Sequence, residues 1–159
     1  MTSAKSVTRS TPSTARATSV STATLTVQTS GCGFIDLTAE AAQFIADVDA
    51  RDGALTLFIR HTSASLTIQE NADPSVLADL TTVLARLAPD DDDAGWTHDT
   101  EGPDDMPAHV KTMLTQTSLH VPVLNGKLAL GTWQGIYLIE HRTRPHRREV
   151  VLQFIGNNQ

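Results

Sequence analysis

118-SLHVPVLNGKLALGTW-133 carries the clearest hairpin pattern in the chain. Apolar and polar residues alternate on the approach to Asn125-Gly126, a pair that favours the two positive-φ positions of a type I′ turn. The stretch therefore predicts a β-hairpin. Pro122 lies in the first arm and lacks a backbone N–H, which indicates an edge strand or an irregular segment.

Further strands are predicted on both sides of this hairpin, because several segments are alternating or rich in β-branched residues. The centre of the segment "GALTLFIR" is apolar on both faces, which predicts a central place in the sheet. The predicted strands cover residues 23–29, 53–60, 65–70, 135–142 and 149–156.

Helices are predicted at three places. Residues 38–50 show helical spacing of apolar residues. Asp73 can cap a helix over 74–87, where Pro74 occupies the first helical position. A short helix is predicted from Pro107. The helix over 74–87 carries one apolar stripe, which consists of Val76, Leu77, Leu80, Val83, Leu84 and Leu87.

Consecutive strands joined by short links favour an antiparallel sheet with the helices on one side. We therefore predict an α+β fold, with a mainly antiparallel β-sheet or sandwich and two to three helices packed on it. This single domain is expected over residues 23–159. Residues 1–22 are mostly Ser, Thr and Ala. They cannot bury enough apolar surface to offset their chain entropy, so a disordered tail is predicted.

The charge is spread unevenly along the chain. Residues 1–24 carry +3, whereas residues 25–159 hold nine Lys/Arg against eighteen Asp/Glu, which gives −9 and a total of −6. So acidic a domain argues against binding to nucleic acid. No apolar run reaches the roughly 18–20 residues that a membrane span needs. The single cysteine, Cys32, indicates a reducing compartment, and a cytoplasmic location is expected.

The segment "RHTSAS" at 60–65 places a histidine and several hydroxyls at the end of a strand. Hydroxyls there suit a phosphate or an oxyanion, and they equally suit an ordinary turn. A covalent Ser–His mechanism is not favoured, because adjacent residues on a strand point to opposite faces and no G-x-S-x-G elbow is present. The candidate residues of this segment are His61, Thr62, Ser63 and Ser65.

The segment "HDTEGPDDMPAHVK" at 98–111 is dense in ionisable groups. Crowded carboxylates repel one another unless a cation, a proton or a hydrogen-bond donor lies among them. Its two histidines match neither a zinc-finger spacing nor H-E-x-x-H, so the spacing leaves metal binding open. The candidates here are His98, Glu101, Asp104, Asp105, His109 and Lys111.

Two further motifs contain candidate residues. "GTWQG" at 131–135 places Trp133 between glycines, where its ring can stack on a ligand or pack on the core. "EHR" at 140–142 ends a predicted strand with three ionisable residues. In "ENADP" at 70–74, capping accounts for Asp73 but leaves Glu70 and Asn71 unexplained.

These motifs, in this order, resemble the YjbQ-like family, also called the secondary thiamine-phosphate synthase family, over roughly residues 25–157. The resemblance implies a homotrimer with pockets near the subunit boundaries. It also implies weak formation of thiamine phosphate, in which a pyrimidine pyrophosphate joins a thiazole phosphate and pyrophosphate leaves. "RTRPHRRE" at 142–149 is not a shared motif, so His146 inherits no role. The family's polar signature maps onto His61, Thr62, Ser63, Ser65, Asn71, Asp73, His98, Glu101, Asp104, Asp105, His109, Lys111, Thr132, Trp133, Gln134, Glu140, His141 and Arg142.

We expect these residues to form one polar pocket around the segment 101–111. Three histidines can hold a divalent metal, zinc or magnesium/manganese, with an open position for a substrate oxygen. The expected ligands are His98, His109 and His141. The expected catalytic residues are Asp104, Asp105, Glu101 and His61. A small phosphorylated metabolite is the expected substrate, and its binding residues are expected to be Thr62, Ser63, Ser65, Asn71, Lys111, Thr132, Trp133, Gln134, Glu140 and Arg142.

Within this site, Lys111 and Arg142 are expected to meet phosphate, and Trp133 to stack on a ring. Two other functions stay open. The protein could bind a small phosphorylated metabolite or a metal without catalysis, or it could hydrolyse a phosphate ester. If the protein is an enzyme, Asp104 or Asp105 is expected to be required for turnover but not for ligand affinity. If the protein only binds a ligand, that difference is not expected.

Overall fold

The computed structural model describes residues 7–90 and 95–158, and it contains two antiparallel β-sheets. Five strands form the larger sheet, in the order β1-β8-β3-β5-β6, and three form the smaller sheet, in the order β2-β7-β4. The larger sheet consists of β1 (Ser19–Gln28), β8 (Arg147–Asn158), β3 (Ala50–Ile59), β5 (Ser118–Leu124) and β6 (Lys127–Leu128). The smaller sheet consists of β2 (Gly33–Asp36), β7 (Gln134–Glu140) and β4 (Ala64–Glu70).

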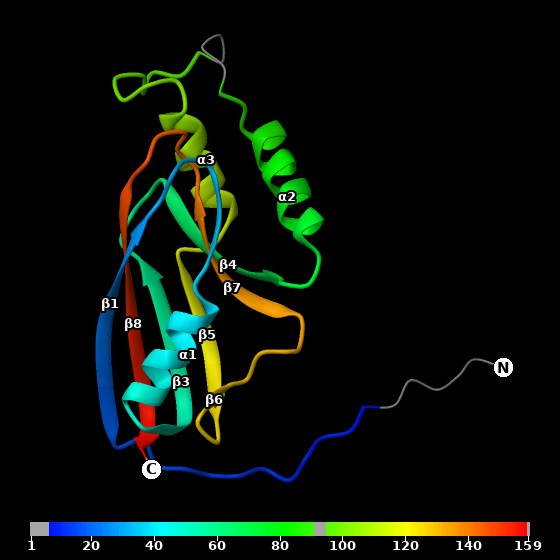
Figure 1. Cartoon of the computed structure of the whole chain (residues 1–159), viewed down its shortest axis with the longest axis vertical. Coiled ribbons are helices and arrows are strands. Elements are labelled where there is room, and N and C mark those ends of the chain that lie inside the picture. The colour runs from blue at the N-terminus through cyan, green and yellow to red at the C-terminus, as the bar shows by residue number, and fades with distance from the viewer. Residues whose placement is uncertain (1–6, 91–94, 159) are drawn as a thin grey trace, which may run out of the picture.

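Three helices accompany the sheets, so the predicted α+β class is confirmed. Helix α1 (Thr38–Asp47) packs on the larger sheet, and α2 (Pro74–Leu87) lies at the side of the molecule, away from that sheet (Figure 1). Helix α3 (Asp105–Leu114) lies at the end of the molecule where β7 finishes. None of the helices in the described residues is both long and apolar enough to cross a membrane.

The hairpin of β5 and β6 forms as its sequence predicts. Asn125 and Gly126 have φ values of 50° and 77°, as a type I′ turn requires. Strand β5 pairs with β3 along its length, but its outer side meets only the two residues of β6. Pro122 is tolerated beside this short partner, where its carbonyl accepts a hydrogen bond from the Ala129 N–H at 2.8 Å.

The core lies on one face of the larger sheet. Leu55, Leu57 and Ile59 of β3 are at most 1% exposed, which is the period of two expected for a strand with one buried face. Strand β3 is central, as predicted, and on its other face Phe58 is 47% exposed. The other main contributors to this core are Phe44, Ile45, Leu66, Val121, Ile136, Leu138, Val150, Leu152 and Phe154.

Helix α2 has the predicted bounds and the predicted cap, because Asp73 Oδ1 accepts the Ser75 N–H at 2.9 Å. Its apolar stripe nevertheless packs only in part. No residue of α2 is fully buried, and Leu87 and Val83 are 60% and 46% exposed. The helix therefore presents apolar surface to its surroundings.

Several boundaries differ from those that the sequence predicts, and α1 ends at Asp47 and not at residue 50 because β3 already begins there. Strand β1 begins at Ser19, within the predicted tail, because residues 19–22 satisfy their backbone groups by pairing with residues 153–156 of β8. Strand β2 was not predicted, since four residues are too few to show a pattern. Helix α3 begins at Asp105 and not at Pro107. Residues 7–18 have no regular secondary structure, and residues 1–6 lie outside the described residues.

Deleting residues 1–17 should leave the melting temperature unchanged, because these residues precede β1. Deleting residues 1–22 should lower it by a few degrees, because four residues of an edge strand are lost. Calorimetry on the full chain and the two truncated proteins measures both effects. Equal melting temperatures for the two truncated proteins would contradict the pairing of residues 19–22.

Candidate functional site

A buried arginine connects the start of α3 to the end of β7. Arg142 is 8% exposed, and its Nε donates to Asp104 Oδ2 at 3.2 Å while its Nη1 donates to Asp105 Oδ1. Its Nη2 donates to the carbonyl of Glu101 at 2.7 Å. All three guanidinium nitrogens therefore have partners inside the chain. Arg142 holds the acidic segment in place, and its predicted contact with a phosphate stays a prediction.

Asp104 is held as a permanent anion. Its Oδ2 also accepts the Thr143 N–H at 2.8 Å and the Thr143 hydroxyl at 2.9 Å. Burial alone would raise the pKa of this carboxyl, but the hydrogen bonds from Thr143 and Arg142 outweigh it and lower the pKa to about 2. Asp104 therefore stays ionised at physiological pH, and its predicted catalytic role stays a prediction.

Asp105 forms a cluster with two histidines. Its Oδ2 lies 2.7 Å from His98 Nε2 and 3.6 Å from His109 Nε2, and one candidate ligand atom from each residue lies within 4.8 Å of the others. The side chain of Asp105 is 4% exposed, whereas those of His98 and His109 are 49% and 32% exposed. The cluster thus has a buried carboxylate at its base and two rings that face solvent.

The sequence places these three groups together in a simple way. Asp105 and His109 are four residues apart on α3, so they share one face of the helix. His98 comes from the preceding segment, and its ring meets that of His109 edge to face with centroids 5.4 Å apart. Two imidazoles and one carboxylate make a donor set that divalent metals bind.

His141 does not belong to this cluster. Its Nε2 lies 2.8 Å from the hydroxyl of buried Ser65, and consecutive side chains leave the end of β7 in different directions. Arg142 points towards α3, and His141 points towards β4. Burial and the nearby Lys111 ammonium lower the pKa of His141 to about 4, so its ring is neutral at pH 7. The cluster thus pairs Asp105, rather than the predicted His141, with His98 and His109.

Glu140 forms a buried ion pair that sequence analysis missed. Arg148 donates from Nε to Glu140 Oε2 at 2.7 Å and from Nη2 to Oε1 at 2.6 Å, and both residues are at most 2% exposed. Thr29 also donates to this carboxylate, at 3.0 Å. Against burial, these bonds lower the pKa of Glu140. Glu140 therefore has its partners inside the chain, and its predicted contact with a substrate stays a prediction.

The signal for Arg148 was present in the sequence. The residues that β8 buries are Val150, Leu152 and Phe154, and the same period of two places Arg148 on their face. By composition alone, the segment 142–148 is typical of a basic turn. The alternation of buried and exposed residues along β8 predicts instead that one arginine of this segment enters the core, where it requires a buried acid as its partner.

Arg148 also reaches the segment after β3. Its Nη2 donates to the Ser63 hydroxyl at 3.1 Å, and the Ser63 N–H donates to His61 Nδ1 at 3.1 Å. The second bond places the proton of a neutral His61 ring on Nε2. Partial burial, and then the charge of Arg148, lower the pKa of His61. His61 is therefore a neutral hydrogen-bond donor towards solvent, and its neighbour Thr62 is exposed.

Other predicted site residues lie far from this end of the molecule. Strands β4 and β7 pair from Ala64–Glu140 to Glu70–Gln134, so the two ends of β7 are roughly 20 Å apart at about 3.4 Å per residue. The Asn71 N–H donates to the Trp133 carbonyl at 3.1 Å at the far end. Within one chain the structure therefore separates this group from the histidine cluster. The group consists of Asn71, Thr132, Trp133 and Gln134, and all four residues are exposed.

Replacing His141 by Gln should change how stability depends on pH. The folded-state pKa of about 4 lies below the ordinary value of 6.5, so the unfolded chain binds a proton first and stability falls as the pH drops from 6.5 towards 4. The contribution is at most about 3 kcal/mol, at 1.36 kcal/mol per pKa unit. Urea unfolding at several pH values should show a flatter profile for His141→Gln. The control, His120→Gln on exposed β5, should keep the wild-type slope, and an unchanged slope in His141→Gln would contradict the assignment.

Comparison with known proteins places the chain in a family. The family model described as UPF0047 protein YjbQ-like matches residues 23–157. The UPF0047 protein sll1880 of Synechocystis is 48% identical over 83% of this chain and 89% of its own length, and UPF0047 protein YjbQ of Escherichia coli O157:H7 is 42% identical over 84% and 96%. A crystal structure of a YjbQ/UPF0047 family protein from Clostridium acetobutylicum superposes with a TM-score of 0.76 at 36% identity, over 84% of this chain and 99% of that one. The chain therefore belongs to the YjbQ-like UPF0047 family.

Proposed function

We propose that the protein binds a divalent metal ion through His98, Asp105 and His109, and that the metal assists a transfer reaction on a small phosphorylated metabolite. The convergence of two histidine nitrogens and one carboxylate oxygen within 4.8 Å carries the proposal. Three protein ligands would leave a coordination position open for a substrate oxygen, as in catalytic zinc sites.

The surroundings of the cluster support a metal site. Ligands of a tetrahedral zinc ion lie about 3.3 Å apart when each bond is near 2.0 Å. Around an ion, the 2.7 Å separation of Asp105 and His98 would therefore have to widen, and the 3.6 Å separation of Asp105 and His109 would have to shorten slightly. The two histidines have room to do so, because both are partly exposed. Asp105 is oriented by Arg142 through its other oxygen, which is the outer-shell contact that fixes metal-bound carboxylates.

A bound metal would supply Lewis-acid stabilisation of a phosphoryl oxygen. The chain itself supplies the placement of the groups around it. Arg142 keeps Asp105 in position, and Asp104 remains ionised and neutralises Arg142. His61 can donate a hydrogen bond from Nε2, since Nδ1 accepts the Ser63 N–H. Glu101 is exposed, with a carboxylate oxygen 3.9 Å from Arg142 Nη1.

The specific reaction that we propose is the one implied by the family resemblance, in which a pyrimidine pyrophosphate and a thiazole phosphate form thiamine phosphate. Departing pyrophosphate carries charge that a divalent metal can stabilise, and no protein nucleophile is required. This agrees with the site, because Ser63 and Ser65 are buried and bonded to other side chains.

The metal site is tested by adding zinc or manganese to protein stripped with EDTA. We expect the melting temperature of the wild type to rise by several degrees, because an ion that binds only the folded state stabilises it. His98→Ala, His109→Ala and Asp105→Asn should each reduce bound metal by at least tenfold in elemental analysis. His146→Ala should retain wild-type metal content.

The same proteins test the reaction. Wild type with metal should release pyrophosphate from the two thiamine precursors, and the EDTA-stripped protein and Asp105→Asn should not. Wild-type protein that takes up no metal would contradict the proposal as a whole. Protein that binds metal through these three residues but shows no turnover would support metal or metabolite binding without catalysis.

We infer that the protein self-associates, as the homotrimer that the family resemblance implies. The support is apolar surface on described residues: Leu87, Met113 and Leu114 are 60%, 77% and 54% exposed on α2 and α3. Such side chains commonly mark contacts between proteins when they gather on one surface.

Light scattering at micromolar concentration should give three times the chain mass of 17.1 kDa. The double substitution Val83→Glu and Leu87→Glu should lower that mass, because it places charge on the apolar stripe of α2. Thr82→Glu, on an exposed position of the same helix, serves as the control and should keep the wild-type mass. A wild-type protein with the mass of one chain would contradict self-association.

A further inference from the structure

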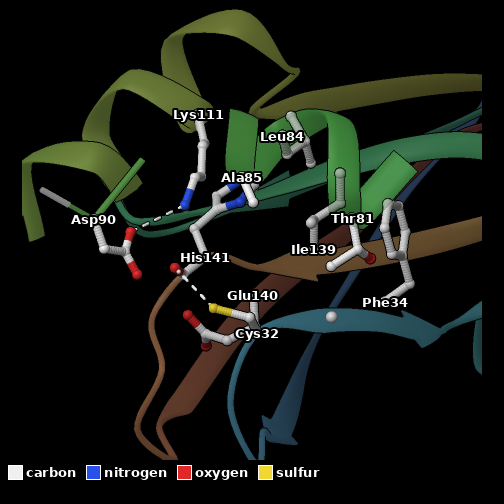
Figure 2. Close-up of a pocket in the computed structure, with 11 residues that line it drawn as sticks. Cys32, Phe34, Thr81, Leu84, Ala85, Asp90, Lys111, Ile139, Glu140 and His141 are labelled. Carbon is white, nitrogen blue, oxygen red and sulfur yellow. Dashed lines mark hydrogen bonds and ion pairs between the residues drawn. The ribbon is translucent and has the colours of Figure 1, made fainter. Parts of the chain in front are cut away.

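A cavity lies beside the segment 139–141, whose residues line it. Its volume is about 90 Å³, and it is lined by α2, by the start of β2 and by the end of β7 (Figure 2). Phe34, Leu84 and Ile139 are among its lining residues, and the lining is mainly apolar. None of the three proposed metal ligands lines it.

One buried cation reaches into this apolar cavity. Lys111 comes from α3 and is 5% exposed, although lysine is almost never fully buried unless it is paired. Its ammonium has three N–H donors. Among the described residues its hydrogen-bond partner is Asp90, with Nζ and Oδ1 3.4 Å apart, which is at the long end of the range for a hydrogen bond (Figure 2). An ammonium held so loosely can bind a second anion.

The other polar groups of the cavity do not compete for this role. His141 is neutral, because burial and Lys111 lower its pKa to about 4. Both oxygens of Glu140 accept hydrogen bonds from Arg148. The thiol of Cys32 stays protonated, because partial burial raises its pKa, and its Sγ lies 3.2 Å from the His141 carbonyl. Lys111 and Asp90 are thus the charged pair that a ligand would meet.

We propose that this cavity binds a small organic carboxylate with an aromatic or branched aliphatic body, and that the carboxylate replaces Asp90 on the Lys111 ammonium. The body of the ligand would pack against Phe34, Leu84 and Ile139. Asp90 can release the lysine at little cost, because its side chain is 36% exposed and regains water when it turns outward. This site does not depend on the proposed metal site.

The charge of the cavity selects a monoanion. One ammonium balances one negative charge, and the carboxylates of Asp90 and Glu140 lie nearby. A phosphate dianion would meet those two carboxylates with a second uncompensated charge, which opposes its binding. A neutral ligand of the same shape would leave Lys111 with Asp90 and gain only apolar contacts.

The test uses benzoate as the probe, with benzamide as its neutral counterpart and phenyl phosphate as the dianion. Full-length protein is kept in EDTA so that metal binding has no influence. Methyl-labelled protein reports on the cavity through the NMR signals of Leu84 and Ile139. The variants are Lys111→Met and Asp90→Asn, and Asp79→Asn provides the same change of charge at an exposed position of α2.

We expect benzoate to shift the Leu84 and Ile139 methyl signals and to bind at least tenfold more tightly than benzamide or phenyl phosphate. Lys111→Met should lower the affinity for benzoate at least tenfold, and Asp90→Asn should raise it severalfold. Asp79→Asn should leave this affinity unchanged. If Lys111→Met does not fold, the contrast between Asp90→Asn and Asp79→Asn decides the question. Any of three results would overturn the proposal. The first is the absence of methyl shifts at benzoate concentrations on the order of 10 mM. The others are equal effects of the two Asp variants and tighter binding of phenyl phosphate than of benzoate.

Discussion

The contact between Arg142 and the paired carboxylates of Asp104 and Asp105 is the interaction on which the candidate site depends. It joins the end of β7 to the first turn of α3, across 37 residues of chain between Asp105 and Arg142. Removing one member of a buried ion pair leaves an uncompensated charge, which costs about 3–5 kcal/mol. The same contact leaves one oxygen of Asp105 facing the two histidines. Stability and the geometry of the cluster are therefore coupled through one guanidinium.

Three consecutive residues at the end of β7 have side chains that face three different surroundings. Glu140 pairs with Arg148 in the core, His141 contacts Ser65 and lines the apolar cavity, and Arg142 holds the acidic turn before α3. Successive side chains of an extended segment diverge, so such a segment can serve neighbouring sites at once. A short stretch of backbone thus connects the cluster of His98, Asp105 and His109, the core and the apolar cavity, and a shift of this stretch would change the geometry of all three.

The sequence predicted the elements better than it predicted which side chains meet. The Asn125-Gly126 turn, the Asp73 cap and the central place of β3 depend on local chemistry or on a period that the sequence displays directly. The residues around Arg142 were also expected to lie together. Which of these residues contact one another was not predictable, because the contacts depend on the direction in which each side chain leaves β7. The separation of Trp133 from the cluster follows from strand register, which the sequence does not specify by itself.

The most direct test of the central claim is a crystal structure of zinc-soaked protein, with diffraction data collected above and below the zinc absorption edge. The account predicts an anomalous peak within bonding distance of His98 Nε2, His109 Nε2 and an oxygen of Asp105, with Arg142 still bound to the other oxygen of that carboxylate. A peak at His61 or His141, or protein without a peak at saturating zinc, would contradict it.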